Sequence, residues 1–285
     1  MRWHSPVSPN NAVARYLAAL AALVAATAPA AAASSFDCVI DPSEVVKLGS
    51  PITGVLDKVL VKRGDAVTAG QPVAVLESTI EAAAVKLNRF KAESTAKIDA
   101  QEERLKLARS RVDRTGSPRG LVVTQDKYEE LRAEAAVAQQ DLLREKQDRE
   151  LSQLDLERSQ ATLDQRTIRS TIDGIVTEKK LSAGEFVNQE GYIVSLSRLD
   201  PLYVEVFLPV IYYKQVHIGT EASVQPAPPI ENTYKATISV VDRVFDPASG
   251  TFGVRLTLPN PGNTLPGGQR CKVSFAFDDK PAAER

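Results

Sequence analysis

Few residues of this 285-residue chain could take part in bond chemistry, and their spacing matches no catalytic or metal-binding motif. The candidates are two histidines, two cysteines and one methionine: His4, His217, Cys38, Cys271 and Met1. Nucleophilic catalysis needs a base beside a nucleophile, and a metal site needs several ligands at close spacing. No neighbouring residue gives His217 such a partner, and the glycines stand in no phosphate-binding spacing. The sequence therefore predicts a protein that is not an enzyme and that binds no metal and no cofactor.

The charge balance excludes a further class of protein. The chain carries 35 Lys and Arg residues against 36 Asp and Glu residues, for a formal net charge of −1. Domains that bind nucleic acid normally carry an excess of basic residues, because their ligand is a polyanion. We therefore expect no nucleic-acid partner.

The N-terminus has the composition of a secretory signal peptide. Arg2 and Arg15 precede an apolar run over residues 16–27, Pro29 ends that run, and the alanines that follow are the small side chains that signal peptidase recognises. A membrane-spanning helix needs about 20 apolar residues, which is longer than this run. We predict a cleaved signal peptide over 1–33 and export to the periplasm, where the protein associates with the cell envelope. A segment that stays as an uncleaved anchor is the alternative.

This compartment bears on the two cysteines. Both remain in the mature chain, Cys38 at the start of one expected strand and Cys271 in the last one. Because the periplasm is oxidising, the two cysteines of an exported protein are commonly bridged. We predict a disulfide between Cys38 and Cys271 that ties the two ends of the mature chain together. Two buried thiols in separate strands are the alternative.

An internal repeat organises the middle of the chain. Residues 50–56 (SPITGVL) align without a gap with residues 170–176 (STIDGIV), and the match continues through Gly64 and Gly184. Each copy has the pattern of two short strands around a turn, where glycine supplies the positive φ that the turn needs. Because one copy cannot bury enough apolar surface to be stable alone, we expect the two copies to pair into one small β-domain.

A long charged segment separates the two copies. Between residues 78 and 169, glycine and proline are confined to a central cluster at 116–120. On either side, seam residues recur at alternating spacings of four and three, which is the pattern of a coiled coil. The first side has Ile80, Ala84, Leu87, Lys91, Ser94, Ile98, Gln101, Leu105, Ala108 and Val112, and the second has Tyr128, Leu131, Ala135, Ala138, Leu142, Glu145, Arg149, Ser152, Leu156, Ser159 and Leu163. The pattern predicts an antiparallel helical hairpin, in which the polar seam residues Lys91, Gln101 and Arg149 weaken the contact and fix its register.

The last third of the chain alternates as half-buried strands do. Strands are expected over 202–208, 222–225, 234–241, 252–258 and 270–277, with a short helical stretch over 210–217 and one more strand upstream, at 41–47. Turn residues separate these strands. We expect a small antiparallel β-barrel that both ends of the mature chain assemble.

The nested order of these parts resembles the periplasmic adaptor proteins, or membrane fusion proteins, of tripartite efflux pumps (the haemolysin-D-type family). The resemblance rests on SPITG at 50–54, VKRGD at 61–65, IDGIV at 172–176, LDPLYVEV at 199–206 and LPGGQ at 265–269. Among adaptors, the chain is most similar to those of resistance–nodulation–division systems. The resemblance implies an α+β multidomain fold: a split biotinyl/lipoyl-like β-domain interrupted by an antiparallel α-helical coiled-coil hairpin, plus a small antiparallel β-barrel.

The resemblance also implies domain limits. The expected parts are a signal peptide at 1–33, a β-barrel at 34–48 and 198–280, a lipoyl-like domain at 49–77 and 170–197, the coiled-coil hairpin at 78–169 and a tail at 281–285. The membrane-proximal domain that the family usually adds is expected to be missing or vestigial.

The function that the resemblance implies involves no catalysis. The protein would link an inner-membrane efflux transporter to an outer-membrane channel, and its copies would form a duct as a hexamer or a trimer of dimers. A proton-driven transporter is favoured over an ATP-driven one. The alternatives are a biotin- or lipoyl-type carrier protein and a free-standing coiled-coil protein of the envelope. A carrier's modified lysine should follow residues 73–77, but the helix begins there instead.

The turn of the hairpin carries the candidate partner contacts. They are Arg111, Arg114, Arg119 and Thr124, which fall nearest to the docking positions of the family. The planar guanidinium of arginine can bind backbone carbonyls or carboxylates of a partner, here the outer-membrane channel or another hairpin. A solvated loop that merely tolerates arginine is the alternative.

Overall fold

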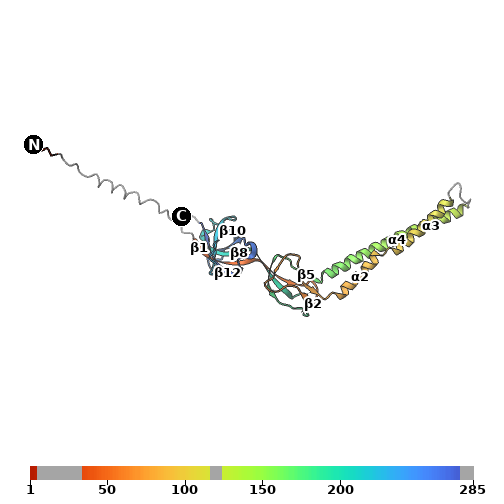
Figure 1. Cartoon of the computed structure of the whole chain (residues 1–285), viewed down its shortest axis with the longest axis horizontal. Coiled ribbons are helices and arrows are strands. Elements are labelled where there is room, and N and C mark those ends of the chain that lie inside the picture. The colour runs from red at the N-terminus through yellow and green to blue at the C-terminus, as the bar shows by residue number, and fades with distance from the viewer. Residues whose placement is uncertain (5–33, 116–123, 277–285) are drawn as a thin grey trace. The chain divides into compact units, whose positions relative to one another are not determined.

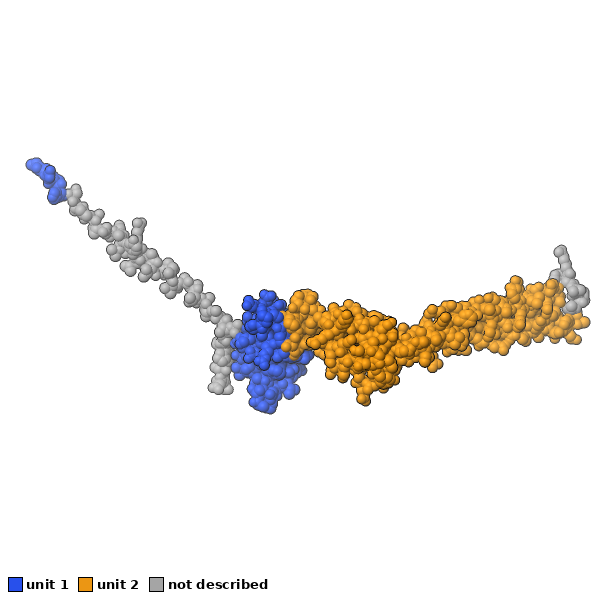
Figure 2. All heavy atoms as spheres, turned by 60° about the horizontal axis from the view of Figure 1, so that its bottom comes forward, with its two compact units in different colours: residues 1–40, 204–258, 269–285 blue, residues 41–203, 259–268 orange. Residues whose placement is uncertain are grey.

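The computed structural model describes residues 1–4, 34–115 and 124–276 (Figure 1). Residues 5–33 of the expected signal peptide, the centre of the hairpin turn with Arg119, and the expected tail lie outside the described residues. The chain forms two compact units (Figure 2): unit 1 takes residues 1–40, 204–258 and 269–285, and unit 2 takes residues 41–203 and 259–268. Residues 41–48, 198–203 and 259–268 thus belong to unit 2, although the sequence-based limits assign them to the barrel.

The β-domain of unit 2 is built from both copies of the repeat. Its strands are β2 (Gly54–Val59), β3 (Ala66–Val67) and β4 (Pro72–Leu76) from the first copy, and β5 (Thr167–Arg169), β6 (Gly174–Lys179), β7 (Phe186–Val187) and the start of β8 (Tyr192–Pro209) from the second. β2 pairs with β7, and β3 pairs with β6, both antiparallel. Each copy therefore completes the sheet of the other, as the repeat predicts.

Backbone hydrogen bonds between the copies repeat in matching positions. The amide of Gly64 donates to the carbonyl of Val176 at 2.8 Å, and the amide of Gly184 donates to the carbonyl of Leu56 at 2.7 Å. Gly64 and Gly184 are equivalent in the repeat, and so are Leu56 and Val176. Both glycines have positive φ, 93° and 87°, which residues with a side chain rarely adopt. The two turns are therefore held by the same pair of bonds with the copies exchanged.

One apolar core fills this β-domain. Its buried members come from both copies: Leu48, Leu56, Val61, Val67, Val73, Ala74, Leu76, Ile168, Ile172, Val176, Val187, Ile193, Val194 and Leu196. Because half of the members lie on either side of the hairpin in sequence, the core forms only when the chain returns from the hairpin.

Two of the sequence motifs meet at Asn260 in unit 2. Its buried side-chain amide donates to the carbonyls of Leu199 and Leu265, both at 2.9 Å. Its side-chain oxygen accepts the amide of Leu265 at 2.9 Å. The short 3-10 helix Pro261–Asn263 follows it. Asn260 thus joins the LDPLYVEV segment to the LPGGQ turn.

Three helices form the hairpin: α2 (Thr79–Glu93), α3 (Ala96–Thr115) and α4 (Gln125–Asp164). α4 lies along both α2 and α3, as Figure 1 shows. Every seam residue predicted for α4, from Tyr128 to Leu163, is buried or half-buried, and the five predicted from Ile98 to Val112 are too. The antiparallel hairpin and most of its seam are therefore confirmed.

The seam predicted from Ile80 to Val112 does not lie on one continuous helix, because a break separates α2 from α3. Ser94 is extended, with φ −66° and ψ 120°, and a new helix starts after Thr95. The hydroxyl of Thr95 lies 3.0 Å from the carboxylate of Asp99, and the carbonyl of Thr95 accepts the amide of Asp99 at 2.9 Å, the first helical bond of α3. Serine and threonine favour such helix ends because their side chains compete for backbone hydrogen bonds. Before this break the predicted seam residues Ile80 and Leu87 are exposed.

Unit 1 holds the barrel. Its strands are β1 (Ser34–Gly49), the end of β8, β9 (Glu221–Pro226), β10 (Tyr234–Val241), β11 (Thr251–Leu258) and β12 (Gln269–Phe275). Their order is β1-β12-β9-β10-β11-β8, and a pairing of β1 with β8 closes the barrel. Residues 34–40 of β1 pair with β12, so the barrel strand begins seven residues earlier than the predicted strand at 41–47.

The helical stretch expected over 210–217 is shorter than predicted. Only the 3-10 helix Val210–Tyr212 forms. Branched residues at its start lower helix propensity. The rings of Tyr212 and Tyr213 instead pack edge-on against Phe36 and Phe252, with centroids 5.5 and 5.2 Å apart. Packing in the barrel therefore overrides the local helical pattern.

Candidate partner-contact site

The arms are tied together just below the hairpin tip. Nη1 of Arg111, on α3, donates to Oε1 of Glu134, on α4, at 2.8 Å. Further from the tip than this pair, Nη2 of Arg109 donates to Oε1 of Gln139 at 3.3 Å. Arg111, a predicted partner contact, is thus already engaged inside the hairpin, although its side chain stays partly exposed.

The other predicted tip residues have separate positions. Thr124 is the N-cap of α4: its hydroxyl accepts the amide of Lys127 at 3.4 Å, and its carbonyl accepts the amide of Tyr128 at 3.1 Å. Arg114 is exposed in the last turn of α3, where a positive charge complements the helix dipole. Arg111 and Thr124 thus make contacts inside the hairpin, whereas among the described residues no hydrogen bond or ion pair is seen for Arg114, which remains a candidate for contact with a partner.

A junction that the sequence analysis missed holds the base of the hairpin. Nη2 of Arg166, which follows α4, lies 2.5 Å from Oε1 of Glu81 in the first turn of α2. The carbonyl of Arg166 also accepts the amide of Leu76 at the end of β4. Arg166 thus joins the helices to the β-domain. The sequence gives no distinct signal for Arg166, because it lies beside a long segment rich in charged residues.

The start of α2 is capped by a carboxylate outside the expected position. Ser78 is the N-cap residue but makes no side-chain cap bond. Instead, Oε1 of Glu77 accepts the amide of Thr79 at 2.9 Å. Hydrogen bonds from Thr79, and the positive charge of Arg166, hold the pKa of Glu77 below its ordinary value. Glu77 is therefore charged at neutral pH where the amides at the start of α2 need an acceptor.

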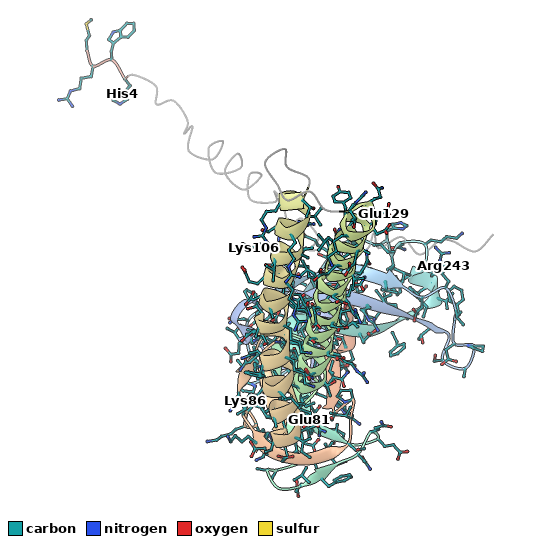
Figure 3. The ribbon with its side chains drawn as sticks, turned by 90° about the vertical axis from the view of Figure 1, so that its right-hand side faces the viewer. His4, Glu81, Lys86, Lys106, Glu129 and Arg243 are labelled. Carbon is teal, nitrogen blue, oxygen red and sulfur yellow. A yellow bond between two sulfur atoms is a disulfide. The ribbon has the colours of Figure 1, made fainter. Side chains whose placement is uncertain are left out.

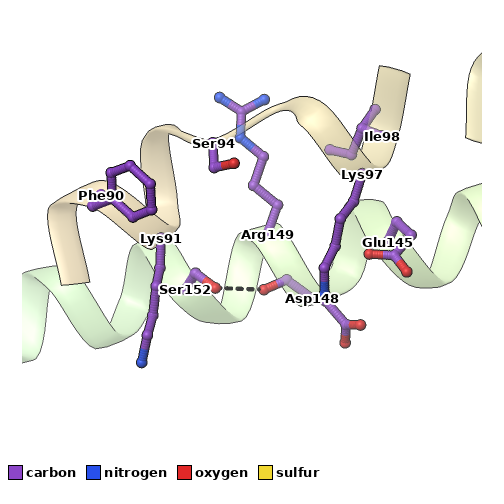
Figure 4. A pocket seen from close by; sticks show the side chains of 9 residues that line it. All are labelled: Phe90, Lys91, Ser94, Lys97, Ile98, Glu145, Asp148, Arg149 and Ser152. Carbon is purple, nitrogen blue, oxygen red and sulfur yellow. Dashed lines mark hydrogen bonds between the residues drawn. The ribbon is translucent and has the colours of Figure 1, made fainter. Parts of the chain in front are cut away.

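Arg149 occupies the break between α2 and α3. Its Nε donates to the carbonyl of Ala92 at 3.2 Å, and Figure 4 shows the side chain reaching from α4 up to the interrupted helix. Around it lies a pocket of about 340 Å³ lined by Phe90, Lys91, Ser94, Lys97, Ile98, Glu145, Asp148, Arg149 and Ser152. In an unbroken helix the carbonyl of Ala92 would accept the amide of Ala96. The arginine therefore supplies a donor that the break removes.

The two cysteines of the sequence lie opposite each other in the barrel. Cys38 on β1 is in register with Cys271 on β12, and the structure joins them in a disulfide. Both residues are buried. The bond spans the two ends of the barrel sequence, with a separation of 233 residues.

The remaining chemical candidates are not gathered into a site. His217 is exposed, and its carbonyl accepts the amide of Thr220 in a turn. Within residues 1–4, 34–115 and 124–276, no group of three or more His, Cys, Asp or Glu side chains could hold a metal ion. Charged side chains such as Lys86 and Lys106 point outward from the helices (Figure 3). In the same described part of the chain, no helix is long and apolar enough to cross a membrane. The hydrogen bonds, ion pairs and disulfide described above are instead contacts between segments of the chain.

Two proteins with similar sequences are named for cation resistance or cation efflux. The cobalt-zinc-cadmium resistance protein CzcB of Cupriavidus metallidurans is 26% identical over 212 residues, which cover 74% of this chain and 38% of that protein. The cation efflux system protein CzcB of an Alcaligenes species has the same identity and coverage. The chain spans about two fifths of the length of these curated relatives.

Solved structures share the fold. MacA from Actinobacillus actinomycetemcomitans superposes with a TM-score of 0.69 at 20% identity, covering 85% of this chain and 78% of that one. A membrane fusion protein from Streptococcus pneumoniae R6 superposes with a TM-score of 0.55 at 15% identity, covering 86% of this chain and all of that one. At these identities the likeness concerns the fold.

A model of a known protein family matches this chain. The model describes the CzcB-like barrel-sandwich hybrid domain and matches residues 44–198, more than half of the chain. This range contains the paired repeat copies and the hairpin between them. With the paired half-domains and the inserted hairpin in place, the chain belongs to the family of proteins with a CzcB-like barrel-sandwich hybrid domain.

Proposed function

We propose that this protein is a non-catalytic periplasmic adaptor that links an inner-membrane efflux transporter to an outer-membrane channel. The signal peptide at 1–33 would export it and be removed. Several copies, as a hexamer or a trimer of dimers, would enclose a duct. Because the chain resembles the adaptors of resistance–nodulation–division systems, we propose a proton-driven transporter rather than an ATP-driven one.

The observation that carries this proposal is the way the hairpin enters and leaves the β-domain. β4 ends at Leu76 and α2 begins at Thr79, while α4 ends at Asp164 and β5 begins at Thr167. With its 40 residues α4 is about 60 Å long, so the domain presents its turn far from its core. Such a long arm suits a protein that must reach a partner at a distance. Binding a partner through the turn requires no catalytic group there.

Loss of export in the source bacterium tests the proposal. Deleting the gene should increase susceptibility to at least one compound of a panel of antibiotics, dyes and divalent metals, and the full chain should restore resistance. Envelope cross-linking followed by purification of the tagged chain should recover an inner-membrane transporter. Unchanged susceptibility together with the absence of any membrane partner would contradict the adaptor role.

The carrier alternative is tested by intact mass. A biotin or lipoyl carrier holds its lysine in a tight turn between strands, whereas here the equivalent chain segment is the hairpin. A mass equal to that of the processed polypeptide supports the adaptor, and a mass increased by one cofactor would support the carrier.

A further inference from the structure

Helix α2 has two faces that could pack on α4. In the structure the buried or half-buried positions are Glu81, Ala84, Val85, Asn88 and Ala92. The neighbouring face carries Ile80, Leu87 and Phe90, whose exposed fractions are 76%, 55% and 74%. The more apolar face of α2 is therefore turned to solvent, which is the reverse of the usual arrangement of an amphipathic helix.

The break at Ser94 and Thr95 sets which face points inward. Buried Ala92 precedes it and buried Ile98 follows it, so the seam advances by six residues where a continuous coiled coil advances by seven. If the helix were continuous with α3 unchanged, the inward positions of α2 would move back by one residue. They would then be Ile80, Ala84, Leu87, Lys91 and Ser94, the seam that periodicity predicts.

Three polar contacts hold the observed face inward. They are the ion pair of Glu81 with Arg166, the bond from Nδ2 of Asn88 to Oγ of Ser159 at 3.3 Å, and the bond from Arg149 to the carbonyl of Ala92. These holding contacts lie at the start, the middle and the end of α2. Each depends on a residue that the one-residue shift would carry away from α4.

We propose that α2 is a two-state element with a second state in which α2 and α3 form one continuous helix. Moving between the states rotates α2 by about 100°, the angle of one residue in an α-helix. The second state buries Ile80 and Leu87 and restores the helical bond from the amide of Ala96 to the carbonyl of Ala92. It gives up the three holding contacts and brings Lys91 towards Arg149. Apolar burial thus favours one state and polar contacts the other.

The switch would couple the two ends of α2. Because a helix turns as a rigid rod, one rotation of α2 breaks both the bond of Arg149 at the break and the ion pair of Arg166 at the base. A change at the junction with the β-domain would therefore alter the arm some 15 residues away, the length of α2. The proposal rests on the hairpin alone and does not depend on the adaptor function.

Paired cysteines can distinguish the states in the full-length protein. The N88C/S159C pair should form a disulfide in the observed state, and the L87C/S159C pair in the continuous state. The K86C/S159C pair points away from α4 in both. Tryptic peptide mapping after mild copper–phenanthroline oxidation identifies each link and separates it from the native disulfide.

Arg149→Leu should shift the balance towards the continuous helix. We expect the L87C/S159C link to form at least about fivefold faster in this variant, since a charged hydrogen bond is lost. Arg144→Leu is the matched control, because Arg144 lies on the same helix but pairs with Asp141 on its own surface. This control should leave the rate unchanged.

A second variant guards against misfolding of Arg149→Leu. Ser94→Ala with Thr95→Ala raises helix propensity at the break and should shift the balance in the same direction. If L87C/S159C links no faster than K86C/S159C in the parent and in every folded variant, α2 has a single state and the proposal is wrong.

Discussion

Arg166 and Glu81 join the far end of α4 to the first turn of α2, with Nη2 and Oε1 2.5 Å apart and side chains only 23% and 15% exposed. The two residues are 85 apart in sequence. Their ion pair therefore fastens the two ends of the hairpin to each other beside the β-domain. It is the contact through which a rigid arm could transmit force to the repeat domain.

Removing either partner should destabilise the protein. Because the pair is mostly buried, we expect Arg166→Ala or Glu81→Ala to lower the free energy of unfolding by about 1.5–3 kcal/mol. Lys106→Ala is the control, since Lys106 and Glu103 form a solvent-exposed pair that should contribute less than about 1 kcal/mol. Urea unfolding followed by circular dichroism measures both. Equal, small effects in all three variants would show that the junction is not structural.

The cap of α2 should depend on pH. Because the pKa of Glu77 is lowered in the folded state, its carboxylate adds stability above the pKa of an unfolded glutamate. This contribution is lost as the pH falls through the folded pKa. Glu77→Gln should therefore be less stable than the parent at pH 7, and the difference should vanish in acid. Glu93→Gln, at the other end of α2, is the control; a difference for Glu77→Gln that persists at low pH would contradict the cap.

Equivalent glycines of the repeat should differ in their tolerance of a side chain. A Cβ at Gly174 would lie 2.5 Å from the carbonyl oxygen of Ser197, a backbone atom that cannot easily move. A Cβ at Gly54 would lie 3.2 Å from Nη1 of Arg166, the end of a flexible side chain. We expect Gly174→Ala to cost about 1–3 kcal/mol and Gly54→Ala clearly less. Thermal unfolding of the two variants decides the point, and equal losses would contradict this account.

The cysteines should be unreactive in the oxidised protein. We expect the unfolded, unreduced chain to take up no thiol label at Cys38 or Cys271, and two labels after reduction. A disulfide that closes so long a loop should raise stability by at most roughly 5 kcal/mol in the chain-entropy picture. Labelling of both cysteines without reduction would show that the thiols are free.

The tip arginines should separate into a structural and a partner contact. Arg114→Glu should leave folding near normal but abolish pump-dependent resistance, with the transporter still co-purifying. Arg111→Glu sets two carboxylates together with Glu134, and the charge swap Arg111→Glu with Glu134→Arg should restore stability. If Arg111→Glu lowers pump-dependent resistance and the charge swap restores it, Arg111 acts only within the hairpin. Full pump activity in Arg114→Glu would show that this residue does not bind a partner.

The parts of the fold that the sequence predicts are those with a repeated local signal. The match between 50–56 and 170–176 predicts that two half-domains pair, and the spacing from Tyr128 to Leu163 predicts the inward face of α4 residue by residue. Each signal extends over several positions, so a single polar residue does not hide it. The family resemblance rests on the same segments.

At the candidate site the sequence predicts the residues but not their partners. Arg111 and Thr124 are near the tip as expected, but one pairs with Glu134 and the other caps α4. Such pairings depend on which residues of the two arms stand at the same height. That height is set by the length of the turn and by the register of the whole hairpin, which no short motif encodes.

The sequence by itself determined the nested plan of half-domains, hairpin and barrel, because hydrophobic periodicity and repetition are properties of each segment alone. Only the tertiary structure decided the face that α2 turns to α4. Its apolar pattern favours Ile80 and Leu87, yet the contacts of Glu81 with Arg166 and of Ala92 with Arg149 turn that face outward. Those contacts join residues more than 50 positions apart, and they exist only once the hairpin has folded back on itself.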